Sequence, residues 1–136
     1  MNDRGVVVFG LLVLAYAMAG AAACGGGGTQ ADRLGVGAQC AIDGDCQDEP
    51  DAGQRCLLQF KGGYCGIQAC TGDATCPAGS ACVLHSDGIN YCFRICIDKP
   101  ECNRHRALDN EANCSSNVTF VDGANNRKAC VPPSGS

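Results

Sequence analysis

Residues 70–92 read CTGDATCPAGSACVLHSDGINYC, in which four cysteines have five, five and nine residues between them. The same opening, two cysteines separated by five residues, recurs before this stretch at Cys40 and after it at Cys96. The cysteines that follow residue 39 thus form three groups of four: Cys40, Cys46, Cys56 and Cys65; Cys70, Cys76, Cys82 and Cys92; Cys96, Cys102, Cys114 and Cys130. The recurrence predicts an internal repeat of roughly 30 residues, with units at 40–65, 70–92 and 96–130.

The spacing of these cysteines favours disulfides over a metal site. Zinc ribbons, haem attachment sites and redox motifs start from a CxxC pair, and this chain has none. Only two histidines, His85 and His105, could complete a zinc site. An exported chain also meets an oxidising compartment, where thiols pair. We therefore predict six disulfides, no bound metal and no other cofactor.

The composition predicts that these disulfides carry much of the stability. The chain has 136 residues, of which 13 are cysteine and 19 glycine, and it lacks tryptophan. The aromatic residues after residue 40 are Phe60, Tyr64, Tyr91, Phe93 and Phe120. Such a chain buries little apolar surface against its conformational entropy, whereas closing a loop of about 15 residues contributes ~3 kcal/mol in the entropic model. The predicted fold is small and disulfide-rich, with three four-cysteine units, short β-hairpins, many loops and an elongated shape.

A hairpin is expected between the third and fourth cysteine of each unit. Each interval contains a turn signal, and these signals are Lys61-Gly62-Gly63, Asp87-Gly88 and Asp122-Gly123. A two-residue Asp-Gly turn places Cys92 opposite Val83, and Cys130 opposite Ser115. A three-residue turn at Lys61-Gly62-Gly63 places Cys65 opposite Gln59. The third and fourth cysteines would then point to opposite faces of their hairpin, where they cannot bond to each other.

Two disulfide patterns remain open under this register. Each unit joins either its first cysteine to its third and its second to its fourth, or its first to its fourth and its second to its third. We favour the former, because it lets the opening loop clamp both faces of the hairpin. It gives the pairs Cys40–Cys56, Cys46–Cys65, Cys70–Cys82, Cys76–Cys92, Cys96–Cys114 and Cys102–Cys130.

The N-terminus is expected to be an export signal. Residues 6–19 are an uninterrupted apolar run, too short for a spanning helix of about 20 residues. The signal would occupy residues 1–23 and end at Ala21-Ala22-Ala23 before Cys24, a sequence that also suits the ordinary signal peptidase. Because 13 cysteines is an odd number, assigning Cys24 to a lipid lets the other 12 pair. Residues 24–39 would then be the lipidated cysteine and a glycine-rich tether spanning on the order of 20 Å, followed by the module at 40–130 and a tail at 131–136.

These features resemble a known family. The lipobox-like Ala21-Ala22-Ala23-Cys24, the glycine run, the C-x5-C repeats and the motif Cys76-Pro77-x-Gly79-x-x-Cys82 look like those of cysteine-rich lipoproteins from myxobacteria and related deltaproteobacteria. The resemblance implies a diacylglyceryl thioether on Cys24 and a lipid-anchored place in the cell envelope. With Gly25 rather than aspartate behind Cys24, it implies sorting to the outer membrane.

Several chemical functions find little support in the sequence. The net charge of −4 argues against a nucleic-acid partner. His85-Ser86-Asp87 has the residue types of a catalytic triad, but neighbours in a turn cannot align a base with both a nucleophile and an acid. The acidic residues Asp43, Asp45, Asp48, Glu49 and Asp51 could hold calcium, although they lack the EF-hand order and match a solvated loop. We therefore expect no enzyme.

The remaining expectation is a binding or interaction module. Disulfides would display variable loops to an unknown protein or glycan, while the lipid on Cys24 holds the module on a membrane. The alternative is an extracytoplasmic protease inhibitor. Its exposed bait would be either Arg104-His105-Arg106 or Phe60-Lys61.

Overall fold

The computed structural model describes residues 28–46 and 53–135. The expected signal at 1–23 and the expected lipid site at Cys24 lie outside these residues. Among the helices of the described ranges, none is both long enough and apolar enough to cross a membrane.

The helices and strands are short. In chain order they are α1 (Gln30–Arg33), the 3₁₀ helix η1 (Asp43–Cys46), β1 (Arg55–Cys56), β2 (Cys65–Gly66), the 3₁₀ helix η2 (Asp73–Thr75), β3 (Ser80–Leu84), β4 (Asn90–Cys96), α2 (Lys99–Cys102), the 3₁₀ helix η3 (Leu108–Asn110), β5 (Asn113–Ser115), β6 (Thr119–Phe120) and β7 (Lys128–Val131). The prediction of a small, loop-rich, disulfide-rich fold with short antiparallel strands is confirmed.

The hairpin register differs from the prediction in all three units. Cys82 lies directly opposite Cys92 in the β3–β4 ladder, where Val83 had been expected. The corresponding cysteines face each other in the other units too: Cys56 lies opposite Cys65, and Cys114 opposite Cys130. The third and fourth cysteines of each unit therefore share a face of the ladder.

The turn of the central hairpin explains the error. Gly88 has φ +83° and donates its N–H to the His85 carbonyl at 3.0 Å, and His85 in turn donates to the Ile89 carbonyl at 2.9 Å. The loop therefore holds three residues, 86–88, with glycine in the left-handed position, instead of two. One extra loop residue shifts the ladder by one position. In the third unit, Asp122-Gly123 does not join β5 to β7, because β6 intervenes and pairs with β3.

The disulfides nevertheless follow the favoured pattern, first to third and second to fourth. The pairs are Cys40–Cys56, Cys46–Cys65, Cys70–Cys82, Cys76–Cys92, Cys96–Cys114 and Cys102–Cys130. Both cysteines of each hairpin bond back to the C-x5-C loop, which approaches the face that carries them. Every bond therefore lies within one unit.

The three C-x5-C loops share an internal hydrogen bond. The side chain just before the second cysteine accepts the N–H of the residue just after the first, in the pairs Asp45–Ala41 (2.8 Å), Thr75–Thr71 (3.2 Å) and Glu101–Ile97 (2.7 Å). In the first two units the middle residue of the loop also bonds to the hairpin. Asp43 accepts the N–H of Cys56 at 2.9 Å, and Asp73 accepts that of Cys82 at 3.0 Å. The repeat therefore extends from spacing to hydrogen bonding.

Replacing Asp73 by alanine is expected to cost more stability than the same change at Asp43. Besides holding Cys82, the Asp73 carboxylate accepts a 2.6 Å hydrogen bond from Arg127, whose guanidinium lies 4.8 Å from the centre of the Phe120 ring. We expect D73A to lower the free energy of unfolding by about 3 kcal/mol and D43A by about 1 kcal/mol. Denaturant unfolding with the disulfides intact measures both values. Equal losses would contradict the role given to Arg127.

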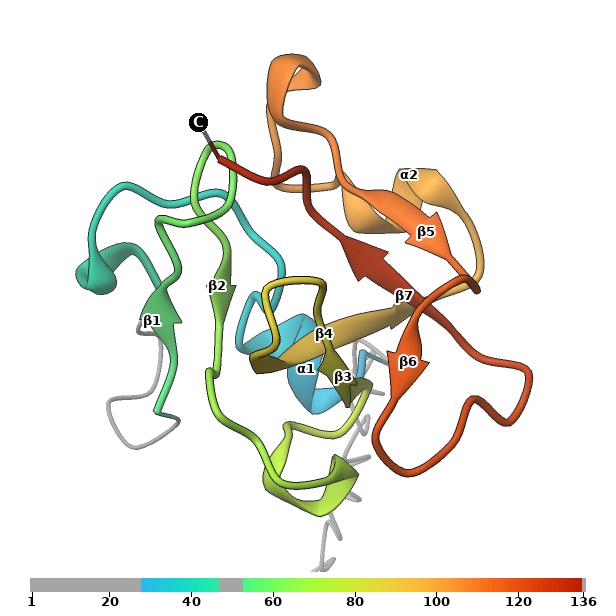
Figure 1. Cartoon of the computed structure of the whole chain (residues 1–136). Coiled ribbons are helices and arrows are strands. Elements are labelled where there is room, and N and C mark those ends of the chain that lie inside the picture. The colour runs from blue at the N-terminus through green and yellow to red at the C-terminus, as the bar shows by residue number, and fades with distance from the viewer. Residues whose placement is uncertain (1–27, 47–52, 136) are drawn as a thin grey trace, which may run out of the picture.

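The second and third units share one sheet. Its strand order is β5-β7-β4-β3-β6, so β3 and β4 of the second unit lie between strands of the third. β1 and β2 of the first unit form a separate two-stranded ladder beside it (Figure 1). The units thus fold around one another, and this arrangement differs from the elongated one expected from the sequence.

The aromatic residues explain why the units come together. One buried cluster contains Ala31, Leu34, Val36, Leu57, Phe60, Tyr64, Ala81, Val83, Tyr91, Phe93, Phe120 and Ala129, drawn from all three units and from the segment before them. The Phe60 ring lies 5.1 Å from Tyr91 and 5.7 Å from Phe93, edge to face. Aromatic pairs at such distances add to the energy of simple burial. The small set of aromatics therefore makes one shared core.

Residues 29–39 belong to this core, although the sequence placed them in a tether. Thr29 and Asp32 form a capping box at the start of α1: the Thr29 hydroxyl accepts the Asp32 N–H, and the Asp32 carboxylate accepts the Thr29 N–H. Ala31 is fully buried, and Leu34 and Val36 pack in the aromatic cluster. The folded body therefore includes Thr29, ten residues before the end of the expected tether.

Candidate functional site

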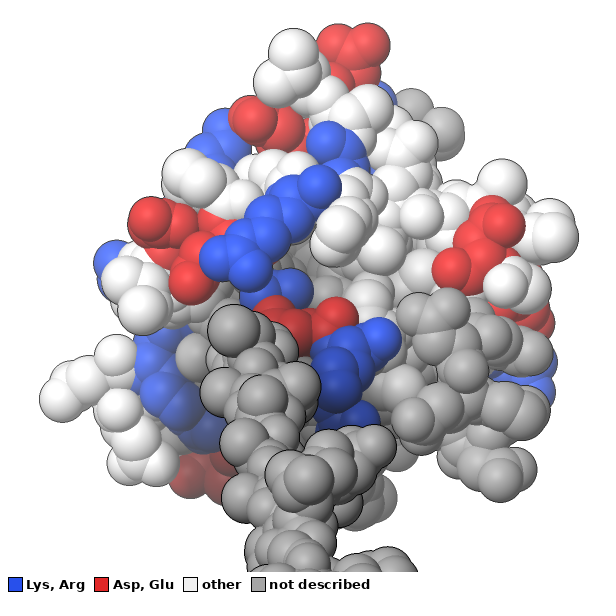
Figure 2. Space-filling view, turned by 180° about the vertical axis from the view of Figure 1, so that it is seen from behind, with Lys and Arg blue, Asp and Glu red and all other residues white. Residues whose placement is uncertain are grey.

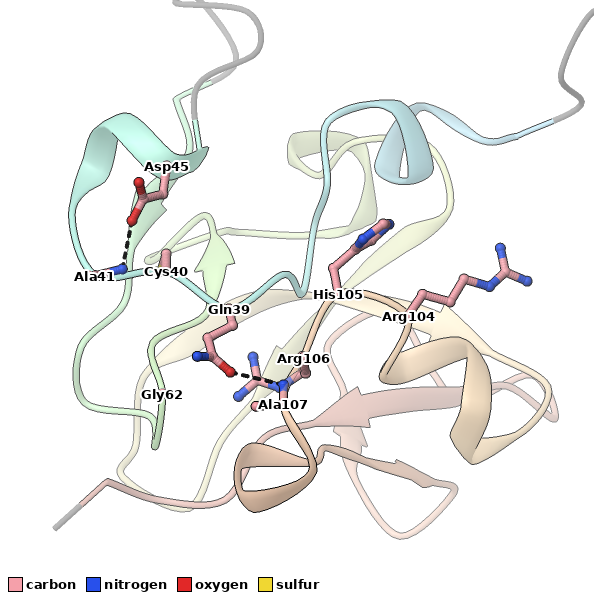
Figure 3. Close-up of a pocket in the computed structure, with 9 residues that line it drawn as sticks. All are labelled: Gln39, Cys40, Ala41, Asp45, Gly62, Arg104, His105, Arg106 and Ala107. Atoms are coloured by element: carbon pink, nitrogen blue, oxygen red, sulfur yellow. Dashed lines mark hydrogen bonds between the residues drawn. The ribbon is translucent and has the colours of Figure 1, made fainter.

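A large depression lies between the first and third units. It is open, with a volume of about 730 Å³. Its lining, drawn in Figure 3, consists of Gln39, Cys40, Ala41, Asp45, Gly62, Arg104, His105, Arg106 and Ala107. It brings together the C-x5-C loop of the first unit and the basic segment after α2, which are distant in the sequence.

Arg106 forms the floor of this depression. The residue is 9% exposed, and its guanidinium donates to four backbone carbonyls: Asn110 at 2.7 Å, Lys61 at 2.8 Å, Gly63 at 2.9 Å and Gly37 at 3.1 Å. Burial lowers the pKa of Arg106, but a guanidinium remains protonated in proteins. Arg106 therefore ties the segment before the first unit, the first hairpin and the third unit together.

These contacts bear on the expected inhibitory loops. Arg106 cannot enter the specificity pocket of a protease while its donors hold the body together. Phe60, in the second expected bait, is 1% exposed and lies in the aromatic core. Lys61 is exposed, but its carbonyl is one of those that Arg106 holds. Neither segment is a free convex loop, so the geometry does not favour an inhibitor.

The polar side chains that are open to solvent lie at the rim of the depression. Arg104 and His105 are exposed, and Figure 3 shows their side chains pointing away from Asp45. Gln39 accepts the N–H of Ala107 at 3.0 Å, and Asp45 accepts that of Ala41 at 2.8 Å. The polar groups on the floor and walls are thus used for structure. Two cationic or polar rim side chains on a fixed base can bind a ligand, but they do not pair a nucleophile with a base.

The structure places His85, Ser86 and Asp87 in the turn between β3 and β4. The His85 ring packs edge-on against Phe60 at 5.2 Å, and its Nδ1 lies 3.3 Å from Oδ1 of Asp87. The Asp87 carboxylate accepts the N–H of Ile89 at 2.9 Å and the hydroxyl of Tyr91 at 2.8 Å. These contacts support the turn and the core, in agreement with the prediction that the three residues are neighbours in a turn.

The candidate metal ligands that the structure describes, Asp43 and Asp45, have structural partners. Asp43 and Asp45 accept backbone N–H groups, while Asp48, Glu49 and Asp51 lie outside the described residues. In each unit three cysteine sulfurs lie within 4.8 Å of one another: Cys40, Cys46 and Cys56; Cys70, Cys76 and Cys92; Cys96, Cys102 and Cys130. Two disulfides therefore pack side by side in each unit, and disulfide sulfurs lack the thiolate that ligates metals.

Carboxylate hydrogen bonds predict a loss of stability in acid. Hydrogen bonds from the N–H groups of Ala41 and Ile42 hold the pKa of Asp45 below its ordinary value. Burial raises the pKa of Asp32 and of Asp87. Hydrogen bonds and nearby cationic groups outweigh that effect, so both pKa values are lowered. A lowered folded-state pKa gives stability that is present above the unfolded value of about 4 and lost as pH falls through the folded value.

We therefore expect the free energy of unfolding to be nearly flat from pH 7 to pH 5 and to fall below pH 4. Urea unfolding at a series of pH values measures it. The variant D45N should shrink this acid-dependent fall, and a chain that becomes more stable below pH 4 would contradict the account.

The structural roles of Arg106 and of the helix α1 were not predicted from the sequence. A signal for α1 was present, because Thr29-Gln30-Ala31-Asp32 precedes the apolar residues Leu34 and Val36, as a capping box does. Arg106 had no such signal. It follows Arg104 and His105 in a short basic segment, and only the tertiary approach of the carbonyls that it binds distinguishes it from Arg104.

Comparison with known proteins adds no family to this description. No family model matches the chain, and no curated protein and no solved structure matches it.

Proposed function

We propose that this protein is a lipid-anchored binding module of the cell envelope, at the outer membrane, with a protein or glycan as its ligand. The observation that carries the proposal is the way each unit is fixed. Two disulfides hold every C-x5-C loop on its hairpin, and a repeated hydrogen bond closes the loop itself. A scaffold that is fixed in this way presents its loops without paying an ordering entropy on binding.

The exposed loops carry side chains suited to binding. Four large apolar residues are more than half exposed: Ile42 at 64%, Leu58 at 65%, Ile97 at 78% and Leu108 at 86%. Ile42, Leu58 and Ile97 lie in loops within two residues of a disulfide-bonded cysteine, and Leu108 begins η3 two residues after Arg106. Apolar side chains on rigid, exposed loops are typical of contact residues in interfaces. They support recognition of a partner surface in preference to catalysis.

The cysteine pairing supports the anchor. Of the 13 cysteines in the chain, 12 are paired by the six disulfides. Cys24 remains, directly after the small residues at which a lipoprotein signal would be cut. Mass spectrometry of the detergent-phase protein tests this: we expect a mature N-terminus at Cys24 with added acyl mass. A C24A protein that still partitions with membranes would contradict the anchor.

Affinity capture tests the binding module. The oxidised mature chain carrying C24A is immobilised and exposed to envelope extract, beside a reduced and alkylated copy. We expect ligands that the oxidised protein retains and the reduced copy loses. The variant L108S should weaken this capture, whereas D109S, a change at the next exposed position, should not. Equal capture by the oxidised and the reduced protein would contradict a role for the rigid loops.

A further inference from the structure

The start of the folded body is firmly attached to the second unit. Ala31 donates its N–H to the Ala78 carbonyl at 2.8 Å, and Ala78 donates to the Gln30 side chain at 3.0 Å. Asp32 forms an ion pair with Arg94 of β4. Thr29 therefore marks a fixed point on the surface, at which the rest of the N-terminal chain is joined to the body.

The distance from this point to Cys24 is short. Cys24 and Thr29 are five residues apart in the sequence, with Gly25–Gly28 between them. Even a fully extended chain of this length reaches at most about 18 Å. Electrostatic forces at a charged surface extend about 8–10 Å at physiological salt. A lipid on Cys24 would thus hold Thr29 within about 18 Å of the headgroups, so the face around Thr29 can come within the range of these forces.

That face carries an exposed apolar side chain. A depression of about 210 Å³ is lined by Thr29 together with Arg94, Ile97 and Glu101. Ile97 is the residue after the first cysteine of the third unit and is 78% exposed. It therefore lies beside Thr29 in the lining of this depression, and most of its side chain is open to solvent among the residues that the structure describes.

Charged side chains of both signs lie beside Ile97. Asp32 is paired with Arg94, and Glu101 accepts the N–H of Ile97 while its other oxygen lies 4.0 Å from Arg104. Asp98, the residue after Ile97, is exposed and accepts the Glu101 N–H at 3.2 Å, whereas Arg33 and Arg104 are exposed basic side chains. Figure 2 views the molecule from behind, the side on which Figure 1 places α1, and shows basic side chains across this side with acidic ones between them.

We infer that this face, with Ile97 at its centre and Arg33 and Arg104 beside it, docks on anionic lipid headgroups. The inference rests on the proposed lipid anchor. Docking of this face would orient the module so that its opposite end faces away from the membrane. In Figure 3 the chain that follows Ala107 lies at the end remote from α1. Leu108, the next residue, is 86% exposed and is available to a partner.

The absence of tryptophan from the chain allows a direct test. Single tryptophans are introduced as I97W and L108W, two matched positions that are 78% and 86% exposed. The acylated protein is bound to phosphatidylglycerol vesicles that contain a lipid with a nitroxide on its headgroup. We expect loss of most I97W emission and little loss of L108W emission. Equal quenching, or stronger quenching of L108W, would overturn the orientation.

Two controls separate this inference from the anchor itself. Flotation of the vesicles reports anchoring, so a protein that does not float overturns both proposals, whereas one that floats with equal quenching overturns the orientation alone. The charge reversals R33E and R104E, made together in the I97W protein, should restore much of the emission. R55E, at an exposed arginine of the first unit, should not. Unchanged quenching in the double variant would contradict an anionic headgroup contact.

Discussion

Replacing Arg106 by methionine is expected to lower the free energy of unfolding by about 3–5 kcal/mol. The change removes the donors of four backbone carbonyls that the fold keeps away from water. A buried acceptor that loses its partner costs about 1–3 kcal/mol, and partial access of water lowers the sum. Domains of this size have only about 5–15 kcal/mol of stability, so R106M would remove a large share of it.

The neighbouring arginine supplies the control. Arg104 is exposed, and its change to methionine should alter stability by no more than about 0.5 kcal/mol. R106K keeps the charge but not the planar set of donors, so it should be intermediate. Denaturant unfolding of the oxidised proteins gives all three values. Equal stability of R106M and R104M would show that Arg106 does not join the units.

Reduction of the disulfides is expected to unfold the whole module. The six bonds close sequence separations of 12 to 28 residues. In the entropic model each loop of this size contributes about 3 kcal/mol, and even a fraction of the total exceeds the stability of a small domain. We expect the reduced chain to lose amide chemical-shift dispersion and near-ultraviolet circular dichroism. A reduced chain that kept both would mean that the aromatic core alone holds the fold.

The disulfide framework could be predicted from the spacing, while the register of the hairpins could not. The choice between the two-residue turn Asp87-Gly88 and the three-residue loop 86–88 depends on whether the Gly88 N–H bonds to His85, and both loops fit the same residues. The favoured pairing was therefore reached through a wrong register. It agrees with the structure because the C-x5-C loop approaches the face that both hairpin cysteines share.

The shared core was beyond sequence reasoning for a different reason. Phe60, Tyr91 and Phe93 lie on hairpins, and the sequence predicts each hairpin to pack within its own unit. Their packing together depends on β6 joining β3 and on Arg106 holding distant carbonyls, and such tertiary contacts leave no periodic trace in the sequence. The glycines before Thr29 likewise favoured a tether, so the capping box that follows them was not recognised. Asp45 and Arg104-His105-Arg106 stand out in the sequence, but the depression that joins them in Figure 3 follows from these tertiary contacts and could not be predicted.

The account depends most directly on the two-disulfide repeat, and disulfide mapping of the oxidised protein tests it. Proteolysis without reduction, followed by mass spectrometry, identifies the joined peptides. We predict only first-to-third and second-to-fourth bonds within each unit, for example Cys70–Cys82 with Cys76–Cys92. A bond between the directly opposed cysteines of a hairpin, such as Cys82–Cys92, or any bond between two units would contradict the account.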